Sequence, residues 1–160
     1  MPAPHRAAAA ASGSAVEPRT EAGDALTELV VKTFRLNGLF LEAAEQLARP
    51  AGLTAAWWQV LGAVLDQPRS VAGIAREMGL ARQSVQRVAD LLASRGLVEY
   101  RPNPAHQRAK LVAPTSAGRG AVQALGATQH EWANRVSAAV GAPEMRQTLD
   151  VVDKLLAALS

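Results

Sequence analysis

Four polar residues between positions 83 and 90 have the side-chain types and the spacing of a surface that reads DNA. A helix that buries its apolar residues in this segment must turn one polar face outward. That face contains Gln83, Gln86, Arg87 and Asp90. Arginine can donate two hydrogen bonds to guanine, and glutamine can bond adenine in a similar bidentate way. Gln83 and Arg87, one turn apart, are therefore the first candidates for reading bases in the major groove.

Other hydroxyl and basic side chains nearby suit the DNA backbone. Such groups bond phosphate oxygens, which orients a protein on the duplex without reading its sequence. Phosphate contacts are expected from Ser70, Arg82, Ser84, Arg101 and Lys110. Arg108 is expected to enter the minor groove, where narrow A-T tracts concentrate negative potential. For each of these side chains the alternative is an ordinary solvated position, and for Arg108 it is a role in bracing its loop.

The charge of the chain is concentrated in the same segment. The 160 residues have a formal net charge of +3, yet residues 69 to 110 hold eight basic and three acidic side chains. This segment is therefore +5, and the rest of the chain is −2. A basic segment in an otherwise slightly acidic protein is typical of a surface that faces phosphates.

Two short helices must position these side chains, and they are predicted over residues 70 to 79 and 82 to 94. Ala75, Gly79 and Val85 stand at offsets zero, four and ten, as a small contact residue, a turn residue and a buried anchor. This pattern indicates a helix-turn-helix, with an ordinary helical hairpin as the alternative. The predicted N-caps of the chain are Thr54, Ser70 and Thr115, and the predicted terminators here are Gly79 and Gly96.

A basic hairpin is predicted directly after the second helix. Its strands are expected over residues 97 to 101 and 108 to 112, with a turn at Pro102, Asn103 and Pro104. A hairpin attached at this point is the wing of a winged helix. The combination of helix-turn-helix and wing is more specific than either part.

Long helices are predicted at both ends of the chain. Apolar residues recur at helical spacing over residues 21 to 48, and they keep a seven-residue repeat over 115 to 139 and over 143 to 160. Few other elements remain to cover these apolar seams, so we expect a second copy of the protein to cover them. The expected organisation is a disordered tail over 1–20 and one protomer over 21–160, with dimerisation helices over 21–50 and 115–160 and a winged-helix lobe over 54–114.

Composition favours a mainly helical protein and excludes several functions. The chain is 49% hydrophobic, with six aromatic residues and no cysteine, which rules out disulfides, thiolate zinc sites and thiol-based sensing. His5, His106 and His130 lack the spacing of paired metal ligands. No run approaches the ~20 apolar residues of a membrane span, and no signal-peptide pattern opens the chain, so a cytoplasmic location is expected.

Two functions from other classes compete with DNA binding. An enzyme is disfavoured, because catalytic motifs are missing and the Gly118-Arg119-Gly120 start of a dinucleotide-binding pattern has Gln123 where the third glycine belongs. A winged-helix module that binds only proteins is the second alternative, since fold alone does not dictate function. Arg87 and Arg108 on the expected reading surfaces argue against such a module.

The stretch that combines these features resembles the MarR family of bacterial regulators, and it reads LTAAWWQVLGAVLDQPRSVAGIAREMGLARQSVQRVADLLASRGLVEYRPNPAHQRAKLVAPTSAGR. The resemblance extends over roughly residues 26 to 160. It rests on the helix-turn-helix, the RGLV entry to the wing and the helix start from Thr115 to Gly118. His106 stands where the family usually has an aspartate two residues before the wing arginine, which is Arg108 here.

The resemblance implies a mainly α, dimeric winged helix-turn-helix fold of six helices with a two-stranded β-hairpin wing. It implies a homodimer, and more specifically a repressor, that reads a palindromic operator in double-stranded DNA and needs no cofactor. Many members of the family also bind small aromatic or phenolic effectors. The residues expected to line such a site are Phe40, Trp57, Trp58 and His130, each with a place in the core as the alternative.

Overall fold

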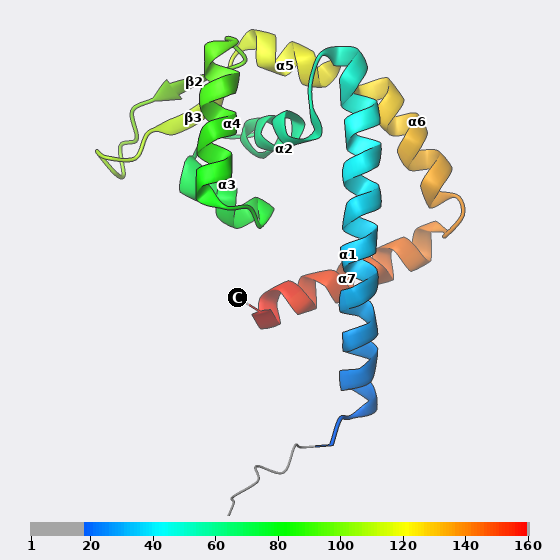
Figure 1. Ribbon diagram of the computed structural model, residues 1–160. Coiled ribbons are helices and arrows are strands. Elements are labelled where there is room, and N and C mark those ends of the chain that lie inside the picture. Colours follow the sequence, from blue (N-terminus) through cyan, green and yellow to red (C-terminus); the bar gives the residue numbers. More distant parts are fainter. Residues whose placement is uncertain (1–17, 160) are drawn as a thin grey trace, which may run out of the picture. The chain divides into compact units, whose positions relative to one another are not determined.

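The computed structural model describes residues 18 to 159, which are mainly helical (Figure 1). Most of the tail predicted over residues 1–20 lies outside these residues. The described part divides into two compact units at a point inside the first helix, between Gly38 and Leu39. The unit that begins at Leu39 contains the rest of the elements.

The order of the elements confirms a mainly helical winged helix-turn-helix fold. The helices are α1 (Glu21–Ala48), the 3-10 turn η1 (Arg49–Ala51), α2 (Ala55–Val64), α3 (Val71–Met78), α4 (Arg82–Ser94), α5 (Ser116–Gln123), α6 (Gly126–Ser137) and α7 (Ala142–Leu159). The strands are β1 (Arg69–Ser70), β2 (Val98–Arg101) and β3 (Leu111–Pro114).

The predicted caps hold the helices of the lobe in place. The Gly73 amide donates to Ser70 Oγ at 3.1 Å, and the Trp57 amide donates to Thr54 Oγ1 at 3.2 Å. Each bond satisfies a backbone donor that the first helical turn would otherwise leave unpaired. Gly79 ends α3 with φ of 63°, a left-handed conformation that glycine adopts without steric cost. The helix-turn-helix therefore begins and turns where its sequence predicts.

The core lies where α2, α3 and α4 meet the small sheet. Its fully buried larger side chains are Leu61, Ile74, Leu92, Val60, Val64, Val85 and Val112. Ala75 and Val85, two members of the predicted triplet, are both buried in this core cluster. Burial of a side chain of this size stabilises the fold by about 1.5–3 kcal/mol. The polar face of α4 is thus fixed by the burial of its opposite face.

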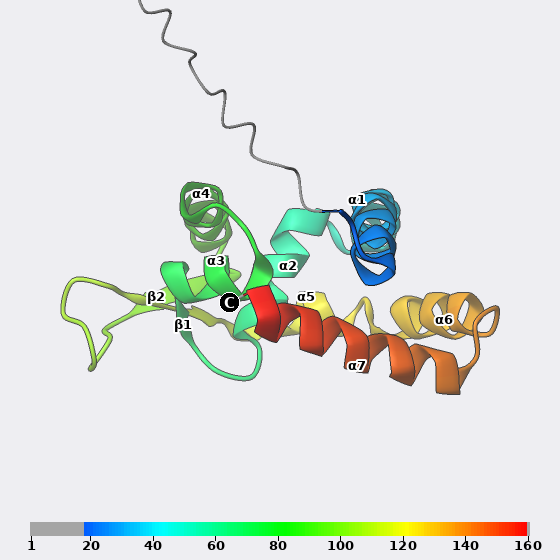
Figure 2. The same ribbon diagram turned by 90° about the horizontal axis from the view of Figure 1, so that it is seen from below.

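The sheet differs from the predicted two-stranded hairpin in two respects. It has three strands in the order β1-β3-β2, because Arg69 and Ser70 pair antiparallel with Val112 and Leu111. In addition, β3 begins at Leu111, so Arg108 lies in the loop between the strands, not in a strand. Successive turns occupy that loop, as the His106 amide donates to the Asn103 carbonyl and the Ala109 amide to the His106 carbonyl. We call residues 102 to 110 the wing loop, and Figure 2 shows it projecting beyond β2.

The helix predicted over residues 115 to 139 is divided into α5 and α6. The interruption falls at Ala124 and Leu125, and Leu125 is buried in the core. The chain then turns back at Gly141, whose φ is 100°, and enters α7 (Figures 1 and 2). Neither α6 nor α7 has a buried residue. Both helices therefore keep their apolar side chains accessible within the protomer.

No helix among residues 18 to 159 is long and apolar enough to span a membrane. The same residues hold no cluster of three or more histidine, aspartate or glutamate side chains placed to bind a metal ion.

Candidate nucleic-acid interface

Five of the predicted DNA-binding residues surround one hollow of about 340 Å³. They are Ser70, Arg82, Gln86, Arg108 and Lys110. The hollow lies between the N-terminus of α3, the first turns of α4 and the wing loop, and Val71, Ala72, Asp90, Tyr100 and Ala109 complete its lining. Ser70 and the wing loop are nearly 40 residues apart in the sequence, and the pairing of β1 with β3 brings them together. The fold thus gathers basic side chains that the sequence only scatters.

Ser70 lines this hollow and also caps α3. Its Oγ accepts the Gly73 amide and so caps α3. The hydroxyl proton is not used by that bond, because a serine hydroxyl is one donor as well as an acceptor. Ser70 can therefore cap the helix and donate to a phosphate oxygen at the same time, and the positive end of the α3 dipole favours an anion there.

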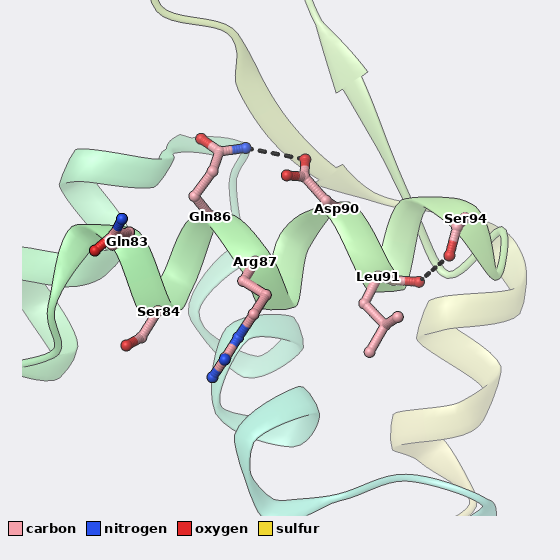
Figure 3. Close-up of a pocket in the computed structure, with 7 residues that line it drawn as sticks. All are labelled: Gln83, Ser84, Gln86, Arg87, Asp90, Leu91 and Ser94. Carbon is pink, nitrogen blue, oxygen red and sulfur yellow. Dashed lines mark hydrogen bonds between the residues drawn. The ribbon is translucent and has the colours of Figure 1, made fainter.

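The outer face of α4 forms a second, larger hollow of about 680 Å³ (Figure 3). It is lined by Gln83, Ser84, Gln86, Arg87, Asp90, Leu91 and Ser94. All seven residues belong to α4, so this is an open helix face and not an enclosed cavity. Figure 3 shows Gln86 and Asp90 on one side of α4, with Ser84 and Arg87 on the other. Gln83 and Arg87 are both exposed, as a reader of base edges must be.

The predicted basic residues differ in their availability to an anion. Among residues 18 to 159, Arg82, Arg87, Arg108 and Lys110 form no salt bridge, and all four are exposed. Arg101 differs, because its Nε donates to Glu99 Oε1 at 2.7 Å. A phosphate would have to compete with that carboxylate for Arg101. Among the basic residues predicted to contact phosphates, Arg82 and Lys110 are therefore more available than Arg101.

Tyr100 is a residue of this surface that the sequence did not indicate. Its hydroxyl donates to Asp90 Oδ1 at 2.6 Å and accepts from Gln86 Nε2 at 2.9 Å. Burial, followed by the hydrogen bond and the charge of Asp90, raises the pKa of Tyr100 to about 12. The hydroxyl therefore keeps its proton near neutral pH. Its partners lie 10 and 14 residues away, on another element, so periodicity alone could not reveal the contact.

The four residues expected to line an effector site do not surround one pocket. Trp57 is buried in the core, with the Arg95 guanidinium 4.8 Å from its ring centroid. Trp58 borders a small hollow of about 320 Å³ at α2, and Phe40 meets Trp132 edge-on with ring centroids 6.3 Å apart. His130 is exposed on α6. The effector site therefore remains a prediction, because no hollow found among residues 18 to 159 brings these four side chains together.

Comparison with known proteins gives three similarities and one family match. Residues 51–109 match the sequence model of the MarR family. An uncharacterized protein of Mycobacterium tuberculosis is 37% identical over 136 residues, which are 85% of this chain and 95% of that protein. The crystal structure of a MarR-family transcriptional regulator from Rhodococcus sp. RHA1 is 25% identical with a TM-score of 0.72, over 81% of this chain and 92% of that one. The M. tuberculosis regulator MosR, solved in complex with DNA, is 24% identical with a TM-score of 0.66, over 81% and 96%.

Proposed function

Since the chain belongs to the MarR family of transcriptional regulators, we propose that it binds double-stranded DNA sequence-specifically, with α4 in the major groove and the wing loop beside it. The observation on which this proposal depends is the grouping of Arg82, Arg108 and Lys110 around one hollow next to the exposed Gln83 and Arg87. The first three suit phosphates or the minor groove, and the last two suit base edges. The proposal assigns the chain no catalytic role.

The proposal includes a homodimer that reads an inverted repeat. It is supported by apolar side chains on α7, where Met145, Leu149 and Val152 are 38%, 59% and 43% exposed. They fall on one face of the helix at i, i+4 and i+7. Within the other unit, Phe34 of α1 is also exposed. A two-fold axis would place twin α4 helices about 10 base pairs apart, or a multiple of that spacing, so that both enter the same side of the duplex.

A repressor and an aromatic effector complete the proposal. A dimer that covers two half-sites occupies the DNA that another protein would need, which favours repression. A thermal-shift screen of small aromatic acids, followed by release of bound DNA, tests the effector. The alternative of a protein-binding module is tested by heparin or bulk DNA retention at low salt, because a module without a phosphate-facing surface would not be retained.

Arg87→Ala should lower affinity for the selected operator by about 1–3 kcal/mol, because a bidentate arginine-guanine contact is worth that much discrimination. Binding to a scrambled duplex should change little. The measurement is fluorescence anisotropy with operator and scrambled duplexes. Arg135→Ala, which removes an exposed arginine from α6, is the control and should leave both affinities unchanged. Equal losses on the two duplexes for Arg87→Ala would show that α4 does not read bases through this residue.

Lys110→Ala should weaken binding to every duplex alike. A lysine that neutralises a phosphate releases about one counterion, so its loss should make the slope of log K against log salt shallower by about 1. A titration of wild type and variant over a salt series gives this slope. An unchanged slope would remove Lys110 from the phosphate-binding residues.

A further inference from the structure

A closed ring of three hydrogen bonds joins α4 to β2 at the edge of the α4 face. The Gln86 side-chain amide donates to Asp90 Oδ1 and to the Tyr100 hydroxyl, at 2.9 Å in each case. The Tyr100 hydroxyl donates to the same Asp90 oxygen at 2.6 Å. Figure 3 shows the bond between Gln86 and Asp90. Both of these residues border the open α4 face as well as the hollow beside the wing loop, so the ring lies where DNA is expected to meet the protein.

The chemistry of Asp90 fixes which end of the Gln86 amide points into the ring. An ionised carboxylate is only an acceptor, so the Gln86 atom 2.9 Å from it must be the nitrogen. A reversed amide would bring two acceptors together at that distance. The nitrogen lies 2.9 Å from both Asp90 Oδ1 and the Tyr100 hydroxyl, so its hydrogens are directed into the ring. Gln86 is therefore left with its carbonyl oxygen, an acceptor, for any further partner.

An acceptor alone distinguishes the four bases differently from a free glutamine. In the major groove, adenine N6 and cytosine N4 are donors, whereas guanine and thymine present only acceptors and the thymine methyl group. A free glutamine side chain can turn its amide and donate to guanine or thymine as well. A glutamine held by its nitrogen can only accept, and it meets guanine or thymine with two acceptors face to face.

We infer that Tyr100 and Asp90 are positioning residues that hold Gln86 as an acceptor, so that it selects adenine or cytosine and disfavours guanine and thymine at the base it faces. The inference rests on the proposed DNA binding and adds to it a specificity-determining contact. It also gives Asp90 a role on a surface where a carboxylate repels phosphates. Tyr100 acts through Gln86 and needs no contact with DNA.

The experiment uses the duplex that the wild-type protein selects from a random library. Each base pair of one half-site is then replaced in turn by the other three, and affinities are measured for wild type, Tyr100→Phe, Gln86→Ala and the double variant. Wild type should prefer adenine or cytosine at one position by about 10-fold. Tyr100→Phe should reduce that preference to about 3-fold or less, and Gln86→Ala should abolish it. In the Gln86→Ala background, Tyr100→Phe should change nothing further at this position.

Each result separates positioning from simple support of the fold. If Tyr100→Phe lowers affinity for all duplexes equally and leaves the preference intact, the hydroxyl only supports β2, and the inference is wrong. The inference is equally wrong if the preference survives in Gln86→Ala. Should Tyr100→Phe melt well below wild type, Asp90→Asn serves instead, because an amide of the same shape lets Gln86 reverse and should relax the same position. Wild type that selects no duplex would overturn the proposed function together with this inference, whereas binding with unaltered preferences overturns the inference alone.

Discussion

Gly118→Ala is expected to destabilise the winged-helix lobe by about 3 kcal/mol or more, beyond the usual cost of overpacking, because the added methyl group has no space and its neighbour cannot move. A Cβ at this position would lie 2.0 Å from the Leu97 carbonyl oxygen and 3.2 Å from Leu61 Cδ2. The Leu97 carbonyl is held in place, since it accepts the Thr115 amide at 3.1 Å. Moving α5 away would break that bond and also the bond from Thr115 Oγ1 to the Gly96 carbonyl.

Gly120→Ala is the matched control on the same helix. A Cβ at Gly120 meets no atom within 4 Å apart from its chain neighbours and the backbone of its own helix, so this substitution should stabilise α5 by about 0.5–1 kcal/mol through the better helix propensity of alanine. Urea unfolding followed by circular dichroism, at one fixed protein concentration, gives both values. If Gly118→Ala unfolds within about 1 kcal/mol of wild type, the close approach of α5 to Leu97 does not hold in solution.

The elements of the lobe could be predicted because their determinants are local. The Ser70 hydroxyl accepts the Gly73 amide three residues away, and the Thr115 hydroxyl accepts the Gly118 amide in the same way. Gly79 ends α3 through its own left-handed backbone conformation. Such contacts depend on only a few neighbouring residues, and the sequence states them directly. The burial of Ala75 and Val85 followed from periodicity in the same way.

The elements that were missed depend on distant partners. Strand β1 has only two residues, and it exists because Arg69 pairs with Val112. Two residues have no periodicity to recognise, and a register between segments more than 40 residues apart is set by the packing of the whole lobe. The start of β3 at Leu111 has the same origin, since the turns of the wing loop occupy the residues before it.

The residues of the candidate site show the same difference between local determinants and distant partners. Side-chain type and helix geometry were enough to place Gln83 and Arg87 on the exposed face of α4. The partner of Tyr100 could not be predicted, because its hydroxyl reaches another element. The pairing of Arg101 with Glu99 could have been predicted from the sequence. Residues two apart in a strand share one face, and a carboxylate there is a natural partner for the guanidinium.

Leu149→Asp is expected to convert the proposed dimer to a monomer at micromolar concentration. A two-fold axis repeats the substitution, so two leucines leave the interface and two carboxylates enter it. Loss of the leucines alone costs about 1.5–3 kcal/mol for each, and burying unpaired charges costs more. The protomer itself should keep its helix content and its folded lobe, because Leu149 is 59% exposed and no residue of α7 is buried in the protomer.

The consequence for DNA follows from linkage of the two half-sites. In a dimer, binding of one lobe brings the other to its half-site at a high effective concentration, and a monomer loses that gain, worth about 100-fold or more in affinity.

Gln147→Asp makes the same change of charge on an exposed position of α7 whose side chain points about 160° away from Leu149. Sedimentation equilibrium and operator titration should show a monomer with weak binding for Leu149→Asp, and wild-type behaviour for Gln147→Asp. A Leu149→Asp protein that stays dimeric would place the interface elsewhere, whereas a monomer that binds the operator as tightly as wild type would contradict the paired reading of half-sites.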